Sequence, residues 1–267
     1  MRGLVEAARD RLAKGASATD VAVETVRALE ASGLYVAGRG ASPNGLGQYE
    51  LDASLMTGPE KHAGAVAALQ GFESPIEAAR LVLEKTPHVM LAGEGAALFA
   101  RQHGCAEIAD PEAWFTRAGQ GEDNHPPGRL SHGTVGCVVL DADGNLAAAT
   151  STAGVFGKLP GRVGDTPVIA AGTWADGHCA VSGTGQGEYF MLTAACAQVS
   201  WRVQAGQSLR QATAAVLAEI GALGGDGGLI AVDREGNIST PYNSEGMKRA
   251  VLTPDGEIRS EVFEPGA

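Results

Sequence analysis

The sequence predicts an α+β fold in which helices and strands form separate layers. Helical patterns fill most of the first half, and two hairpins bracket a pair of helices in the second half. This order argues against alternating βαβ units, in which a helix follows each strand. The 267 residues, 44% of them apolar, suffice for one large domain or two small ones with a substantial core.

The first half begins with two amphipathic helices. The first ends at Gly15, and the second follows a Ser17–Asp20 pattern that resembles a capping box and ends at Gly33. A glycine-rich stretch comes next. The elements expected after it are a strand over Leu51–Met56, a helix that starts at Ser74 with a proline at its first position and ends before Pro87, and a helix over Glu94–Gln102.

The second half follows a polar, proline-containing segment, Gln120–Ser131, which is the best linker in the chain. A valine-rich strand over Thr134–Leu140 comes directly after it. The sequence Asp143-Gly144-Asn145 is typical of a hairpin turn, and Leu146–Thr150 forms the returning strand. The same pattern recurs near the end, and two helices lie between. These later elements are the helices Tyr189–Gln204 and Leu209–Ile220, the strands Leu229–Val232 and Ile238–Thr240, and a Ser208–Gln211 cap.

Composition excludes several classes of function. The formal net charge of −11 argues against nucleic-acid binding, which needs a basic surface. No apolar run reaches the length of a membrane span, and the charged first twenty residues do not resemble a signal peptide. The four cysteines show no C-x-x-C spacing, so the expected location is the reducing cytoplasm, and no metal site is expected.

Hydroxyl and charged residues gather in four short stretches. Thr134 lies where the linker meets a buried strand, and Thr150-Ser151-Thr152 ends the partner strand. Arg162 and Asp165 stand three residues apart, and Gly183-Thr184-Gly185-Gln186-Gly187-Glu188 precedes a helix. Each has an ordinary interpretation: threonine is common in strands, and an arginine with an aspartate is often a weak surface ion pair.

Together these stretches resemble the plant-type (type 2) L-asparaginase and isoaspartyl-peptidase family of threonine peptidases. The resemblance is most specific in HGTVGCVVLDADGNLAAATSTAGVFGKLPGRVGD, residues 132–165, and extends to GTGQGE and GGDGGLIAVDREGNISTPYNSEGM. In the first half it covers LDASLMTG and SPIEAARLVLEKTPHVMLAGEGA, so that nearly the whole chain resembles the family.

The resemblance implies a four-layer αββα sandwich of the N-terminal-nucleophile (Ntn) hydrolase type. It implies a single domain, 1–267, that cleaves itself between Gly133 and Thr134 into fragments 1–133 and 134–267, with the linker over about 120–133. A homodimer of cleaved pairs is expected, acting on a small molecule or dipeptide without a cofactor. The region Gly38–Gly58 resembles a loop that holds sodium through backbone carbonyls.

The family's roles pass to this chain by position. Thr134 resembles the nucleophile and Thr152 the threonine that orients it, while Thr184 and the N–H of Gly185 resemble the oxyanion hole. The substrate-binding set comprises Arg162 for the α-carboxylate and Asp165, assisted by the Gly187 carbonyl, for the α-ammonium. The implied reaction is hydrolysis of β-aspartyl dipeptides, of the L-asparagine side-chain amide, or of both.

The chemistry agrees with these implied roles. A threonine hydroxyl is a weak nucleophile that needs a base. Cleavage before Thr134 would free its own α-amine, whose unperturbed pKa of about 7.7–8.0 suits proton transfer near neutral pH. Gly133 allows a strained backbone at the cleaved bond without a side-chain cost.

Four departures from the family pattern keep two other functions open. The family usually begins with a strand that this chain starts after, and its absence would expose the edge of a neighbouring strand. Val36 replaces a common asparagine, Ala153 a glycine, and Gln186 a small residue. The alternatives are an Ntn threonine hydrolase for a different small amide or peptide, and an unprocessed, non-catalytic binding domain.

Overall fold

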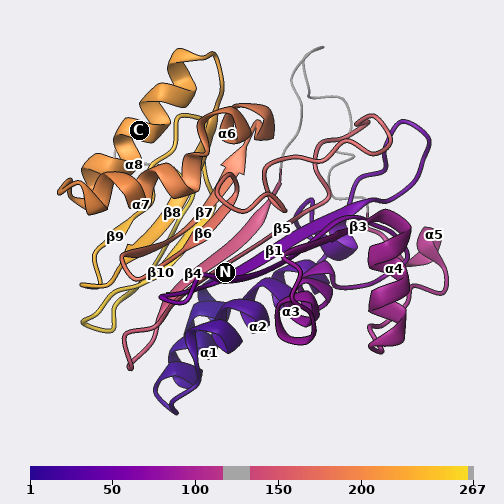
Figure 1. Cartoon of the computed structure of the whole chain (residues 1–267), viewed down its shortest axis with the longest axis horizontal. Helices are drawn as coiled ribbons and strands as arrows, with labels where there is room; N and C mark the ends of the chain where they lie inside the picture. Colours follow the sequence, from indigo (N-terminus) through magenta and orange to yellow (C-terminus); the bar gives the residue numbers. More distant parts are fainter. Residues whose placement is uncertain (117–132, 264–267) are drawn as a thin grey trace.

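The structure is a computed structural model, and it describes residues 1–116 and 133–263. Two sheets face each other, and helices cover the outer side of each (Figure 1). An α+β fold is therefore confirmed. Apolar residues of both sheets meet between them, including Met56 and Leu146 from one sheet and Ala180 and Val232 from the other. In the described residues, no helix is long and apolar enough to cross a membrane.

The first sheet has five strands in the order β3-β2-β1-β5-β4. All neighbours are antiparallel except β2 and β3. The helices of this half pack on its outer face and bury Val26, Ile76 and Val82 against it. The elements are α1 Arg2–Leu12, α2 Ala18–Ala31, the 3₁₀ turn Gly38–Gly40, β1 Leu51–Gly58, β2 His62–Leu69, α3 Pro75–Lys85, β3 Met90–Ala92, α4 Gly93–Gln102, α5 Pro111–Trp114, β4 Val135–Leu140 and β5 Leu146–Thr152.

The second sheet has four strands in the order β6-β7-β8-β9, all antiparallel. Helices α7 and α8 cover it and bury Phe190, Val199 and Ile220. A separate hairpin, β10–β11, packs beside α1. The elements are β6 Thr173–Ala175, β7 Cys179–Gly185, α6 Gly187–Thr193, α7 Ala195–Gln204, α8 Leu209–Ala222, β8 Gly227–Asp233, β9 Ile238–Ser239, β10 Arg249–Leu252 and β11 Ile258–Glu261.

The structure changes two of the sequence predictions. The helix predicted over Tyr189–Gln204 is two helices, because Ala194 adopts a left-handed conformation with φ of 47°. The Ser74 side chain lies at the start of α3 but does not cap it. Its hydroxyl donates instead to Glu30 Oε2 at 2.5 Å, and Glu30 Oε1 accepts the N–H of Ile76. By contrast, the predicted Ser208–Gln211 capping box is confirmed.

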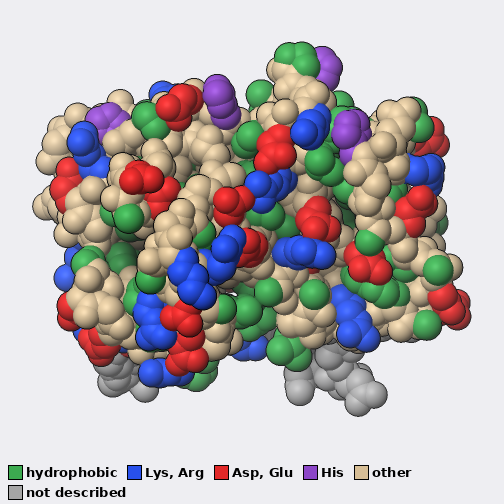
Figure 2. All heavy atoms as spheres, turned by 90° about the horizontal axis from the view of Figure 1, so that it is seen from below, with side chains coloured by type: hydrophobic (Ala, Val, Ile, Leu, Met, Phe, Trp, Pro, Cys, Tyr) green, Lys and Arg blue, Asp and Glu red, His purple; other side chains and the backbone are tan. Residues whose placement is uncertain are grey.

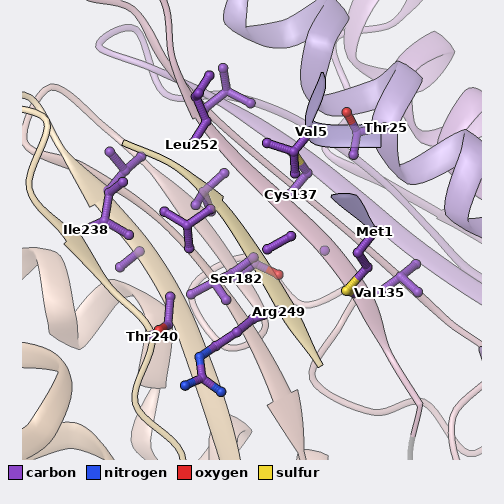
Figure 3. Close-up of a pocket in the computed structure, with 18 of the residues that line it drawn as sticks. Met1, Val5, Thr25, Val135, Cys137, Ser182, Ile238, Thr240, Arg249 and Leu252 are labelled. Atoms are coloured by element: carbon purple, nitrogen blue, oxygen red, sulfur yellow. The ribbon is translucent and has the colours of Figure 1, made fainter. Parts of the chain in front are cut away.

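Strand β4 lies at the edge of the first sheet. Among the described strands β4 pairs only with β5, and β10 only with β11. The free edges of β4 and β10 line one cavity of about 1410 Å³, which α1 and β8 also border. Figure 3 shows Val135 and Cys137 of β4 and Leu252 of β10 on its walls, with Val5 of α1 nearby. Thr134, at the start of β4, lies at this cavity.

The surface mixes charges of both signs. Figure 2, seen from below, shows Lys and Arg side chains interspersed with Asp and Glu. Several of the helices of the first half contribute ion pairs, such as Arg11 with Glu24 and Arg80 with Asp20. These pairs are substantially exposed, so each contributes little to the free energy of unfolding.

Glu30 is buried inside the first layer of helices. Only 1% of it is exposed, and burial raises the pKa of its carboxyl from 4.5 to about 7. The Glu30 carboxyl therefore binds its proton more tightly in the folded chain than in the unfolded chain. The resulting contribution to the free energy of unfolding is fully present below pH 4.5 and is lost as the pH rises through about 7.

Replacing Glu30 by glutamine should remove this pH dependence, because the amide stays neutral and can still accept from Ile76. Relative to the original chain, Glu30→Gln should gain up to about 3 kcal/mol between pH 4.5 and pH 8. The check is the thermal unfolding midpoint at both pH values, with the exposed Glu60→Gln as control. Parallel shifts in all three proteins would contradict the assignment.

Candidate active site

Thr134 and Thr152 meet because β4 and β5 form an antiparallel hairpin. Val135 lies opposite Ser151 in the register, which places the start of β4 beside the end of β5. The Thr134 hydroxyl donates to Thr152 Oγ1 at 3.2 Å. The sequence prediction that Thr152 contacts Thr134 is thus reproduced by the geometry.

Backbone groups fix the Thr152 side chain, which is almost fully buried. Its Oγ1 accepts the N–H of Gly154 at 3.0 Å, and its hydroxyl lies 3.4 Å from the Val36 carbonyl. The same Val36 carbonyl accepts the N–H of Ala153 at 2.8 Å. Val36 and Ala153, two departures from the family pattern, therefore contribute backbone groups beside Thr152, the neighbour of Thr134.

Gly133 lies directly against Val36. A Cβ atom on Gly133 would come within 2.6 Å of Val36 Cγ2 and 2.8 Å of its backbone nitrogen. Contacts this short exclude a side chain at position 133. The bond before Thr134 is therefore held against a buried residue, with the threonine hydroxyl one residue away.

Thr184 and Gly185 end strand β7 and line the same cavity as Thr134. Gly185 has φ of 149°, and a Cβ there would lie 2.3 Å from the Asp226 carbonyl. Only glycine fits this backbone and this approach. Gln186 also lines the cavity, and its side-chain oxygen accepts the N–H of Asp226 at 3.3 Å. The cavity thus contains a nucleophile candidate and a glycine-threonine strand end.

Arg162 pairs with Glu188 rather than with Asp165. Its guanidinium makes three contacts of 2.8–3.0 Å with the Glu188 carboxylate. The arginine side chain is 16% exposed and the glutamate 53%. An Arg162–Asp165 surface ion pair, the ordinary interpretation of the sequence, is therefore wrong.

Asp165 is buried beside Gly187. A Cβ on Gly187 would lie 2.7 Å from Asp165 Oδ1, which makes position 187 another close approach. Burial, the largest cause, together with the Glu188 charge raises the pKa of Asp165 to about 7, although the Arg162 charge opposes this shift. In the described part of the chain Oδ2 has no hydrogen-bond partner. A buried carboxylate with a vacant oxygen is suited to receive a cationic group.

The structure brings the predicted residues into two connected groups. Thr134, Thr184 and Gly185 line the cavity, whereas Arg162 and Asp165 are outside its lining. Gly187, which contacts Asp165, lies two residues after Gly185 of the cavity lining. Gly154 lies between Arg162 and Thr152, because its N–H donates to Thr152 Oγ1. A Cβ on Gly154 would lie 3.2 Å from Arg162 Nη1.

Sequence reasoning missed Glu188 and Lys158, although both stand inside the quoted motifs. Glu188 ends the GTGQGE stretch, and its charge next to a glycine-rich turn was a usable signal for a partner of Arg162. Lys158 is a single lysine between Gly157 and Leu159, and nothing in the sequence marks it as buried.

The sodium site expected from the sequence would use backbone carbonyls of the Gly38–Gly58 region. Those of Asn44, Gln48 and Glu50 already accept hydrogen bonds from Gly47, Asn44 and Lys158 respectively. Among residues 1–116 and 133–263 there is also no cluster of three or more metal-binding His, Cys, Asp or Glu side chains.

Comparison with known proteins shows extensive similarity. The sequence profile of a family described as Asparaginase matches residues 1–260. An isoaspartyl peptidase of Salmonella typhimurium is 46% identical over 265 residues, 92% of this chain and 84% of that protein. The isoaspartyl peptidase of Escherichia coli is 44% identical over 268 residues, 94% and 83% respectively. A plant-type L-asparaginase of Pyrobaculum calidifontis is 39% identical over 276 residues, 98% and 92%.

Proposed function

This chain belongs to the asparaginase family, and from that premise we propose that it hydrolyses β-aspartyl dipeptides, the L-asparagine side-chain amide, or both. We propose that Thr134 is the nucleophile after the chain cuts itself before that residue. The observation that carries the proposal is the Thr134–Thr152 contact of 3.2 Å beside a glycine that cannot bear a side chain.

In the processing step, Thr134 Oγ attacks the carbonyl carbon of Gly133. A C–O bond forms, the C–N bond breaks, and the proton of the hydroxyl passes to the departing nitrogen. Water then hydrolyses the ester to a Gly133 carboxylate and a Thr134 hydroxyl with a free α-amine. The tight contact of Gly133 with Val36 supports this step, because it limits the conformations of the bond to be cut.

In the hydrolytic step, the new α-amine takes the hydroxyl proton as Oγ attacks the substrate's side-chain carbonyl carbon. The negative charge on the carbonyl oxygen faces the Thr184 hydroxyl and the Gly185 N–H. The leaving amine receives a proton as the C–N bond breaks. Water then cleaves the acyl-enzyme and regenerates Thr134. Thr152 keeps the hydroxyl oriented between the two steps.

Arg162 and Asp165 select the substrate by its amino-acid head group. The guanidinium of Arg162 can bind an α-carboxylate in the geometry it now uses for Glu188, which is half exposed and can yield the position. The vacant Oδ2 of Asp165 suits an α-ammonium. Binding at these two points leaves the side-chain amide as the reactive end of the substrate.

Gln186 lines the cavity where the family often has a small residue, and this favours a second candidate, hydrolysis of another small amide or peptide. Purified protein should be assayed with isoaspartyl dipeptides, L-asparagine and unrelated amides, and its fragments weighed by mass spectrometry. Fragments 1–133 and 134–267 with aspartyl activity support the first function, whereas cleavage without that activity supports the second. A single uncut, inactive chain would support a non-catalytic binding domain.

Activity should rise with pH through two ionisations. Asp165 must be charged to bind an ammonium, and its pKa is about 7 before substrate binds. The freed amine of Thr134 must be neutral, and its unperturbed pKa is about 7.7–8.0. Log kcat/KM should therefore increase with a slope approaching two below pH 7.

In the Asp165→Asn variant only the Thr134 amine titrates. Its activity should be weaker, and log kcat/KM should rise with pH with a slope of one. Arg162, Glu188 and Cys196 are the other charged or titratable groups that interact with Asp165. An unchanged slope in Asp165→Asn would count against this role.

We extend the proposal to the fold, the oligomeric state and the cellular location. We assign the fold to the αββα sandwich of the Ntn hydrolases, supported by two facing sheets with helices outside each. Residues 1–133 and 134–267 would form one intertwined domain, since β4 and β5 complete the sheet begun by β1. A homodimer and a cytoplasmic location are supported by exposed Leu159 and Leu192 and by four free cysteines. Sedimentation of the cleaved protein tests the dimer.

A further inference from the structure

Lys158 is a fully buried cation in a loop that carries substrate-binding residues. Its side chain is 0% exposed. The ammonium donates to the Glu50 carbonyl at 3.1 Å and lies 3.8 Å from Glu50 Oε2. Burial lowers the pKa of Lys158, and the carboxylates of Asp52 and Glu50 oppose that shift. A buried ammonium without its anionic neighbours would be strongly destabilising.

The contacts around Lys158 join two segments that are far apart in sequence. Glu50 Oε1 accepts the N–H of Gly161 at 2.9 Å. The Lys158 carbonyl accepts the N–H of Gly45 at 2.8 Å, and the Pro43 carbonyl accepts the N–H of Gly157 at 3.2 Å. Residues 43–50 therefore hold residues 157–161 from one side by both charge and backbone contacts.

The same ammonium lies next to the substrate-binding arginine. A Cβ on Gly154 would lie 3.4 Å from Lys158 Nζ and 3.2 Å from Arg162 Nη1, so both cations border one glycine. The N–H of this glycine donates to Thr152 Oγ1. Lys158 and Arg162 also repel each other electrostatically, which lowers the pKa of Lys158. Glu50 and Asp52 are the anionic neighbours of Lys158, and Glu188 is the anionic partner of Arg162.

Mutual repulsion and separate anions give the loop a defined arrangement. The Lys158 ammonium interacts with Glu50 and Asp52, whereas the Arg162 guanidinium binds Glu188 through its Nε and Nη2 atoms. Asp52 lies opposite Thr152 in the β1–β5 register, so the anchor is built on the strand beside the reactive hairpin. Its Oδ2 has no hydrogen-bond partner among the described residues, and its main favourable charge interaction is with Lys158.

We propose that Lys158 is a positioning residue: its ammonium, held by Glu50 and Asp52, fixes the 153–165 loop so that Arg162 is aimed at the substrate α-carboxylate. Lys158 touches no substrate in this arrangement and acts only through Arg162. The inference rests on the proposed function for the identity of that carboxylate. In this proposal the positive charge beside Glu50, in the Gly38–Gly58 region, is the Lys158 ammonium.

The test uses Lys158→Met, which keeps the length of the side chain and removes its charge. The affinity for L-aspartate, measured by calorimetry, should fall about 10-fold, and KM should rise similarly while kcat changes less than about 3-fold. Cleavage before Thr134 should continue. The exposed Lys85→Met at the end of α3 is the matched control and should bind L-aspartate normally.

A double-mutant cycle distinguishes positioning from general damage. Because Lys158 acts through Arg162, Lys158→Met should have no further effect on L-aspartate affinity in an Arg162→Leu background. An equal loss in both backgrounds, or an unchanged affinity in the single variant, would overturn the proposal. If Lys158→Met is insoluble, Glu50→Gln replaces it, with an expected loss of about 3-fold that again disappears without Arg162.

The outcomes also separate this proposal from the proposed function. A chain that binds L-aspartate with an affinity that depends on Arg162 and, through it, on Lys158, but that hydrolyses no β-aspartyl amide, would refute only the function. A chain that cuts itself and hydrolyses such amides, with Lys158→Met behaving as the unmodified protein, would refute only the positioning role. Absence of both L-aspartate binding and β-aspartyl hydrolysis in the unmodified protein would refute both.

Discussion

Thr134→Ala is expected to yield one uncut chain of 267 residues without hydrolytic activity, whereas the unmodified protein yields fragments 1–133 and 134–267. The substitution removes the only hydroxyl next to Gly133, so neither the ester of the processing step nor the acyl-enzyme can form. The loss of activity should be at least about 10⁴-fold, as for other nucleophile deletions. A denaturing gel, intact mass and an amidase assay provide the measurement.

Thr134→Ser is the control for this experiment, because it keeps the hydroxyl and removes only a methyl group. It should cut itself and retain measurable activity. Two fragments from Thr134→Ala, or full activity from an unbroken chain, would remove the basis for the nucleophile assignment. The Thr152 contact of 3.2 Å would then be a structural hydrogen bond only.

Arg162→Leu should lower kcat/KM about 100-fold while leaving cleavage before Thr134 unchanged. A bidentate, charge-assisted contact to a carboxylate contributes about 3 kcal/mol, and leucine cannot make it. Most of the loss should appear in KM, because the guanidinium contacts the head group rather than the reacting carbonyl. Steady-state kinetics with a β-aspartyl dipeptide give the two parameters.

Arg101→Leu is a suitable comparison for Arg162→Leu. Arg101 makes a similar bidentate pair with Glu107, but its side chain is 58% exposed and lies on α4, away from the site. Its loss should leave kcat/KM within about 2-fold. A large decrease in kcat with unchanged KM for Arg162→Leu would show that the arginine acts on the reacting groups instead.

The fold was predictable where periodicity is strong. The helices α2, α3 and α8 and the hairpin β4–β5 follow from apolar spacing, caps and the Asp-Gly-Asn turn. Strand β2, HAGAVAAL, was missed because its alanines carry little strand preference and its partners lie elsewhere in the sequence. No glycine or proline marks the break between α6 and α7 at Ala194, so the sequence pattern does not predict it.

The sequence named the candidate site residues one by one, but not the pairings that the structure gives them. Thr134 and Thr152 were placed together by motif resemblance, and the hairpin register explains why they meet. The partner of Arg162 is Glu188, 26 residues away, and that of Lys158 is Glu50, 108 residues away. Such pairs depend on how distant segments are brought together, which no local pattern encodes. Burial of Glu30 and Lys158 likewise depends on the assembled layers.

The unpaired edge of β4 affects how the position of Thr134, at the start of this strand, is fixed. Backbone amides along a strand point alternately to either side, so half of those in β4 bond to β5 and the rest face the cavity. Among the described strands, β4 therefore takes its hydrogen-bond register from β5 alone and from the turn that joins the two. Asp141 anchors that turn through the N–H groups of Asp143 and Asn145, and it also accepts the N–H of Ala18. The Asp141 carboxylate, at the turn end of the hairpin, thereby helps to hold the register that places Thr134 beside Thr152.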